Sequence, residues 1–182
     1  SGAAEMVYGV DASGVIRHVS EVEGGLACGC SCPSCTRPLI ARKRHATPHF
    51  AHQSSYSCSN APETALHRLA KEIISTERCL VVPEVKAEFR GASKLIHKKQ
   101  QVHVELINEE AQHLPSVVPD LYVECGGHPL LIEIYVTHAC DELKVKTLSE
   151  IGIATVEIDL SRFARDAPRS AVRDAVVERA DR

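Results

Sequence analysis

The sequence of 182 residues lacks any run of about 18 consecutive apolar residues, the length that a membrane-spanning helix requires. It also lacks a secretory signal pattern, internal repeats and low-complexity segments. These absences lead us to expect a cytoplasmic protein with no membrane partner. The hydrophobic content of 44% is enough for a packed core, so one domain, or a small module joined to a medium-sized one, is expected.

An excess of positive charge is absent as well, because the formal net charge is −3. The chain therefore has no global basic signature of a nucleic-acid-binding protein. Basic residues are nevertheless grouped in two places, first at Arg37, Arg42, Lys43, Arg44 and His45, and again at Lys94, His97, Lys98 and Lys99. Each group can contact nucleic acid or can simply be a solvated loop tip, so the charge pattern leaves DNA open as a partner.

Eight cysteines are present, but their spacing does not favour disulfide bonds. Four of them, Cys28, Cys30, Cys32 and Cys35, lie too close together to join distant parts of a fold. The spacing Cys32-Pro-Ser-Cys35 is typical of a zinc knuckle, in which both thiolates face one tetrahedral ion. A redox role for this pair is less favoured, because no thioredoxin-type strand and helix surround it.

The remaining zinc ligands are expected from the segment that follows the knuckle. Residues 39–42 and 49–52 read as two strands of a hairpin, and the return strand brings His52 back opposite Cys35. Cys58 follows soon after, so we predict a structural zinc site of Cys32, Cys35, His52 and Cys58. Cys28, Cys30 and His49 are alternative ligands, and which four of the seven bind the metal is left open.

Hydrophobic periodicity predicts an α+β fold in two parts. Residues 1–60 read as β-hairpins and a zinc-binding module, beginning with strands at 6–10 and 15–19. Residues 61–182 read as a helix from Ala61, strands near 80–89, 102–106, 117–123 and 130–136, a helix at 140–150, a strand at 154–160 and a helix at 170–179. This order suggests a mixed sheet with helices packed on it. The last helix has Val172, Val176 and Val177 on one side, which packs internally or contacts another subunit or protein.

Glu133 carries the main functional signal, because it interrupts an apolar run that is expected to be buried on both faces. A buried carboxylate must be paired or hold a metal. With Asp120 from the preceding strand it forms the oxygen-rich site that Mg²⁺ or Mn²⁺ prefers, and Lys144 can stabilise charge there. Glu63 and His67 share one helix face and can serve as a third ligand or as orienting groups. The alternative is a structural ion pair between Glu133 and a basic residue.

Several segments together resemble the competence protein CoiA-like family. The resemblance rests on residues 28–35, 49–52, 63–71, 119–120, 133–138 and 157–161, and it extends over about residues 6 to 161. The family is grouped with the PD-(D/E)xK nucleases, which implies a restriction-endonuclease-like αβββαβ core over residues 61–182. It also implies that Asp120 and Glu133 bind the catalytic metal, that Glu63 is the acidic residue of the first helix, and that DNA is processed.

One position departs from the pattern of that family. The lysine expected two residues after Glu133 is replaced by Tyr135, and Lys144 can reach the same site from the neighbouring helix. We therefore expect a metal-dependent deoxyribonuclease with catalytic residues Glu63, His67, Asp120, Glu133 and Lys144. The alternative is a catalytically inactive module of the same fold that binds DNA or protein.

Overall fold

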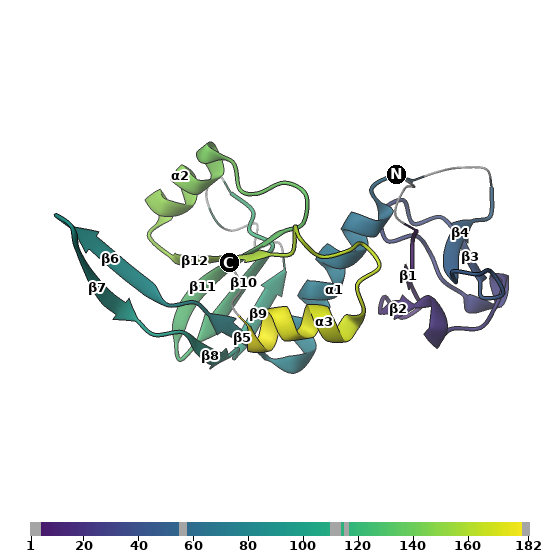
Figure 1. The fold of residues 1–182 in the computed structure, drawn as a ribbon, viewed down its shortest axis with the longest axis horizontal. Coiled ribbons are helices and arrows are strands. Elements are labelled where there is room, and N and C mark those ends of the chain that lie inside the picture. Colours follow the sequence, from purple (N-terminus) through teal and green to yellow (C-terminus); the bar gives the residue numbers. More distant parts are fainter. Residues whose placement is uncertain (1–4, 55–57, 110–113, 115–116, 180–182) are drawn as a thin grey trace. The chain divides into compact units, whose positions relative to one another are not determined.

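The chain forms short β-strands as well as α-helices, which confirms the predicted mixed α+β class (Figure 1). The computed structural model describes residues 5–54, 58–109, 114 and 117–179. The chain divides into two units, of which the first comprises Ser1–Glu72 with Phe163–Arg169 and the second Ile73–Arg162 with Ser170–Arg182. The domain boundary expected after residue 60 stays a prediction.

Two antiparallel hairpins form the first unit, as the sequence predicted. Strands β1 (Tyr8–Val10) and β2 (Ile16–His18) pair around a turn in which Asp11 Oδ1 accepts hydrogen bonds from the backbone of Ser13 and Val15. Strands β3 (Leu39–Arg42) and β4 (His49–His52) form the second hairpin. Between the hairpins lie the short 3₁₀ helices η1 (Val19–Glu21) and η2 (Leu26–Cys28).

The core of the first unit lies between these hairpins and the cysteine-rich segment. Its buried members are Met6, Val19, Cys30, Cys32, Leu39, Ala41, Phe50 and Ala61. Packing is closest at Gly9, where an added Cβ would lie 3.2 Å from both the Cβ of Cys30 and a methyl of Leu39. A side chain at position 9 would therefore push two core residues apart.

The helix expected from Ala61 is present as α1 (Ala61–Glu77). Its predicted apolar stripe is confirmed, because Leu66, Leu69, Ala70, Ile73 and Ile74 are each at most 2% exposed. Arg78 has a φ of +54°, the left-handed conformation that commonly terminates a helix. The division between the two units falls inside this helix, after Glu72.

A four-stranded mixed sheet in the order β12-β11-β10-β9 forms the centre of the second unit. Strands β9 (Leu106–Glu109), β10 (Leu121–Cys125) and β11 (His128–Tyr135) are antiparallel neighbours. The turn between β10 and β11 uses Gly126 and Gly127 with φ of +59° and +73°, as a tight primed turn requires. Helix α2 (Glu142–Ile151) then connects β11 to β12 (Ala154–Asp159), which pairs parallel to it.

The segment between α1 and this sheet differs from the prediction. Strand β5 (Cys79–Val82) pairs with β8 (Gln100–His103), and β6 (Val85–Phe89) pairs with β7 (Ala92–His97). The single strand expected over 102–106 is wrong, because the backbone changes partners between β8 and β9. Val104 N donates to Arg78 O, whereas Glu105 N donates to Glu124 O in the larger sheet.

The closing helix predicted over 170–179 is divided into α3 (Arg169–Arg173) and a π-helical turn, η3 (Asp174–Glu178). Its apolar residues Val172, Val176 and Val177 are at most 1% exposed, so they pack internally within this chain. The side-chain amide nitrogen of Gln101, Nε2, donates a hydrogen bond to Val177 O and thereby connects β8 to η3. Within the described residues, no helix has both the length and the apolar character needed to cross a membrane.

Candidate metal centre and carboxylate site

Three of the four predicted zinc ligands converge in the first unit. One ligand atom from each of Cys32, Cys35 and His52 lies within 4.8 Å of the other two, and Cys35 Sγ is 3.2 Å from His52 Nε2. Pairing of β3 with β4 places His52 opposite Leu39, close to the cysteine turn. That turn is closed by Thr36 N donating to Cys32 O at 3.0 Å. This cluster can hold a structural metal ion.

The protonation chemistry of the cluster suits a cation. Burial and the positive charge of Arg37 lower the pKa of His52, so its imidazole is neutral at pH 7 and has a lone pair to donate. Burial alone would raise the pKa of Cys35, but hydrogen bonds from the Arg37 backbone and from Cys32 and Cys58 outweigh it and lower that pKa. Burial raises the pKa of Cys32 to about 11, and a thiol that coordinates a metal ion releases its proton to solvent and binds as the thiolate.

The other candidate zinc ligands fall into two groups. Cys58 packs against the same buried cluster and hydrogen-bonds to Cys35. The thiols of Cys28 and Cys30 instead donate hydrogen bonds to backbone carbonyls, Cys28 Sγ to Leu39 O and Cys30 Sγ to Cys28 O. His49 is at the other end of the β3–β4 hairpin, opposite Arg42. Of the additional candidates, Cys58 is thus the one that interacts with Cys35, although its sulfur is outside the group of three ligand atoms that lie within 4.8 Å of one another.

In the second unit the structure brings Asp120, Glu133 and Lys144 together. Glu133 is 4% exposed in the middle of the buried part of β11, and Lys144 Nζ donates to its Oε2 at 2.7 Å. Asp120 directly precedes β10, and its Oδ2 accepts from Ile134 N at 2.8 Å. The antiparallel register pairs Leu121 with Ile132, so Asp120 lies at the end of the ladder beside Glu133.

Helix α2 fixes the lysine of this site. Asp141 caps the helix, because its Oδ1 accepts from Lys144 N at 2.7 Å and thereby orders the first turn. Burial alone would lower the pKa of Lys144, but the hydrogen bond to Glu133 and the negative charges of Glu133 and Asp120 outweigh it and raise that pKa. The lysine therefore stays positively charged at neutral pH.

The predicted residues of α1 belong to the first unit. Glu63 and His67 are half-buried, one helical turn apart on the part of α1 that precedes Ile73. Their grouping with Asp120 and Glu133 stays a prediction. Tyr135, at the position where the family pattern has lysine, ends β11, and its carbonyl accepts from Leu160 N at 2.7 Å.

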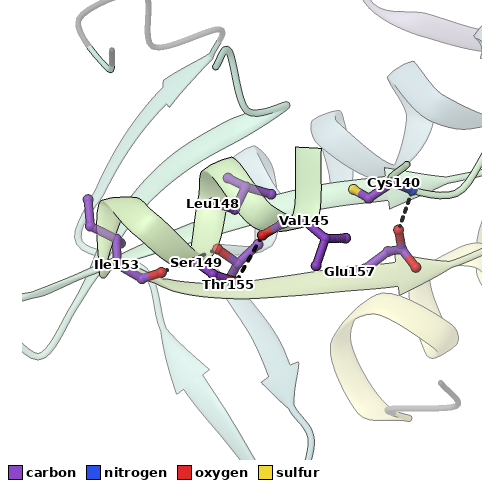
Figure 2. A pocket seen from close by; sticks show the side chains of 7 residues that line it. All are labelled: Cys140, Val145, Leu148, Ser149, Ile153, Thr155 and Glu157. Carbon is purple, nitrogen blue, oxygen red and sulfur yellow. Dashed lines mark hydrogen bonds between the residues drawn. The ribbon is translucent and has the colours of Figure 1, made fainter. Parts of the chain in front are cut away.

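Glu157 was missed by the sequence reasoning as a neighbour of this site. It is directly opposite Glu133 in the parallel β11–β12 register, so both side chains are on the same face of the sheet. Its Oε2 accepts from Cys140 N at 3.0 Å (Figure 2). A carboxylate inside the apolar strand at 154–160 was the available signal, the same kind of interruption that drew attention to Glu133.

A cavity of about 400 Å³ lies beside Glu157, between α2 and β12 (Figure 2). Its lining is mixed, with apolar side chains and two hydroxyls, and consists of Cys140, Val145, Leu148, Ser149, Ile153, Thr155 and Glu157. Burial and then the charge of Glu133 raise the pKa of Cys140 to about 12, so its thiol stays protonated at neutral pH. Cys140 is accordingly a poor nucleophile here.

Comparison of the chain with protein-family models, with curated proteins and with solved structures gives no match. The resemblance to the CoiA-like family therefore stays a prediction from the motifs.

Proposed function

We propose that this chain is a metal-dependent deoxyribonuclease whose site is built from Asp120, Glu133 and Lys144. The observation that carries the proposal is the 2.7 Å contact of Lys144 Nζ with the buried carboxylate of Glu133, beside Asp120. Two carboxylates and one lysine, held at the edge where a loop, a strand and a helix meet, are the groups that phosphodiester hydrolysis needs.

The donor set fits Mg²⁺ or Mn²⁺. These ions bind through one or two carboxylates and leave the other positions to water and to phosphate oxygens. Asp120 and Glu133 are the two carboxylates, and Ile134 N–H orients Asp120 by its hydrogen bond. When bound, the metal supplies Lewis-acid stabilisation of the phosphate and activation of water.

The protein residues themselves have distinct tasks in this proposal. Lys144 stays protonated, so it can neutralise negative charge that develops on the phosphate oxygens. Its ammonium donates to Glu133 and its backbone N donates to the capping Asp141, which limits the reorganisation needed when substrate binds. The roles expected for Glu63 and His67 stay predictions from the sequence, because both residues belong to the first unit.

The order of elements supports a restriction-endonuclease-like core. After α1, the larger sheet is formed by three antiparallel strands, β9, β10 and β11, followed by the crossover helix α2 and the parallel strand β12. This is an αβββαβ order in which strands β5, β6, β7 and β8 are inserted along the chain between the first helix and the larger sheet. In this proposal Lys144 on α2 has the role of the lysine that the family pattern places at position 135, where this chain has tyrosine.

We further propose that the first unit binds one structural Zn²⁺ through Cys32, Cys35, His52 and Cys58. Three thiolates and one imidazole form a closed tetrahedral set with no position for substrate, which favours a structural rather than a catalytic ion. The hydrogen bond of Cys58 to Cys35 supports Cys58 as the fourth ligand over Cys28, Cys30 and His49.

A second candidate function is a catalytically inactive module that binds DNA or protein. It is favoured by the same ion pair, because Lys144 already neutralises Glu133 and Tyr135 stands where lysine is expected. In this case the two side chains would serve stability alone.

Cleavage assays separate the two functions. The wild type and Glu133→Gln would be incubated with linear and circular DNA, with and without Mg²⁺ or Mn²⁺, and Glu150→Gln on the exposed side of α2 serves as the matched control. Metal-dependent cleavage by the wild type and by Glu150→Gln, but not by Glu133→Gln, supports the nuclease. DNA binding without cleavage by all three favours the inactive module.

A further inference from the structure

The β6–β7 hairpin is an exposed arm of the second unit (Figure 1). Its base is the β5–β8 pair, where Leu80 and Val81 are at most 3% exposed and Gln101 is bonded to η3. Pro83 has no N–H and separates β5 from β6, so the ladder is interrupted where the buried base ends. The arm is thus anchored at one end and projects at the other.

Neither face of strand β7 is covered within the described part of the chain. Leu95 and Ile96 are neighbours in β7 and are 42% and 59% exposed. Because successive residues of a strand point to opposite faces, these two values mean that both faces are accessible. A two-stranded hairpin of this kind is only marginally stable by itself, and its exposed apolar side chains favour a partner.

The charge of the arm identifies the class of that partner. Residues 85–99, which are the hairpin and the two lysines that follow β7 at its base, contain five basic residues and one acidic residue, a formal net charge of +4 in a chain whose total is −3. Lys94, Lys98 and Lys99 are exposed and have no ion-pair partner among the described residues. This concentration of positive charge complements a polyanion rather than a second copy of this acidic chain.

The shape of the arm fits duplex DNA. A strand of five residues such as β6 is roughly 17 Å long, and its partner strand runs about 5 Å away. The major groove of B-DNA, about 12 Å wide, admits a two-stranded ribbon of this size. In such a position the lysines reach phosphates on the groove walls, and Leu95 or Ile96 meets base edges or thymine methyl groups.

We propose that the β6–β7 arm binds duplex DNA in the major groove, with Lys94 of β7 contacting a phosphate and with Lys98 and Lys99, which follow β7 at the base of the arm, contacting phosphates beside it. Together with the proposed nuclease function, on which this part rests, the arm holds the duplex for the carboxylate site and makes double-stranded DNA the substrate. The contacts are to phosphates more than to bases, so the binding is largely independent of sequence.

The test measures binding rather than cleavage. Fluorescence anisotropy of a labelled duplex of about 20 base pairs is recorded over a range of salt concentrations, without added divalent metal, for the wild type and for the triple variant Lys94→Gln, Lys98→Gln and Lys99→Gln. Each lost phosphate contact reduces the slope of log K against log salt concentration by about 0.9, so a reduction of about 2 to 3 is expected. At low salt the affinity falls by tenfold or more.

Two controls make the result specific to the arm. Lys146→Gln, Arg162→Gln and Arg179→Gln together remove the same charge at exposed positions outside the arm and outside both basic groups, and this variant keeps the wild-type slope. Circular dichroism checks that both triple variants remain folded. An unchanged slope in the arm variant, an equal loss in the control, or absence of duplex binding by the wild type overturns the proposal.

Further outcomes separate the arm from its alternatives and from the proposed function. Equal binding of single-stranded DNA with the same salt slope overturns the groove geometry. A wild-type dimer in sedimentation that Leu95→Ser and Ile96→Ser convert to a monomer assigns the arm to a second copy instead. If Glu133→Gln and the wild type both fail to cleave while only the arm variant loses binding, the arm proposal stands and the nuclease proposal fails.

Discussion

Replacing Lys144 by methionine keeps most of the side-chain volume and removes the positive charge that faces Glu133. Removal of one partner from a fully buried ion pair costs about 3–5 kcal/mol, because the other charge stays buried. Here the lysine side chain is 29% exposed and the glutamate 5%, so water reaches the pair from one side. We therefore expect a loss of about 2 kcal/mol in the free energy of unfolding, below the fully buried value.

Urea unfolding followed by circular dichroism measures this loss for Lys144→Met, for Glu133→Gln and for the double variant. Removal of both charges leaves no unpaired ion, so the double variant is expected to be more stable than the sum of the single losses predicts, by about 1–2 kcal/mol. Lys146→Met, on the same helix with a side chain 72% exposed, serves as the control and changes stability by less than about 0.5 kcal/mol. Equal effects of the two lysine variants, or additive losses in the cycle, would refute the reasoning.

Three further perturbations test the first unit. Cys58→Ser is expected to lower zinc content below one ion per chain and to reduce thermal stability, whereas Cys28→Ser keeps the metal; elemental analysis and melting curves decide between them. Burial raises the pKa of Tyr8 to about 12, so the stability that its neutral hydroxyl contributes is complete below pH 10 and is lost as the pH rises toward 12. Tyr8→Phe removes the 2.7 Å hydrogen bond to Ala167 O and should lower the free energy of unfolding by about 1 kcal/mol at pH 7. Between pH 10 and 12 the melting temperature of this variant should fall less than that of the wild type. Parallel curves of melting temperature against pH for the two proteins would contradict this. Gly9→Ala forces a Cβ to within 3.2 Å of core atoms and should destabilise by about 1–3 kcal/mol in urea unfolding, and a neutral effect would show that the core relaxes.

Elements with strong local signals were predictable from the sequence. The turn at Asp11, the helix start at Ala61 and the Gly126–Gly127 hairpin each depend on residues only a few positions apart, and the structure confirms all three. The same holds for three residues of the knuckle, because the hairpin expected over 39–52 brings His52 back to Cys32 and Cys35. Local chemistry and hydrophobic period were sufficient in these places.

Features that depend on long-range pairing were not predictable. Strand β7 of the arm has no buried side chain, so it lacks the hydrophobic alternation by which a strand is recognised, and its sequence resembles that of a loop. The change of partners between Val104 and Glu105 depends on Arg78 and Glu124, which are distant in sequence. Glu157 became a neighbour of Glu133 only through the parallel register of β11 and β12.

The most direct test of the central claim is the cleavage rate of duplex DNA with Mn²⁺, compared for the wild type, Asp120→Asn and Glu133→Gln. All three proteins should be folded and have the same zinc content, since both substitutions are in the second unit and the proposed zinc ligands are in the first. The account predicts metal-dependent cleavage by the wild type and a loss of at least about 100-fold in each variant, as removal of a group that stabilises the transition state produces. Cleavage at equal rates by the wild type and both variants, or no cleavage by any of them, would contradict the assignment of these carboxylates as a nuclease site.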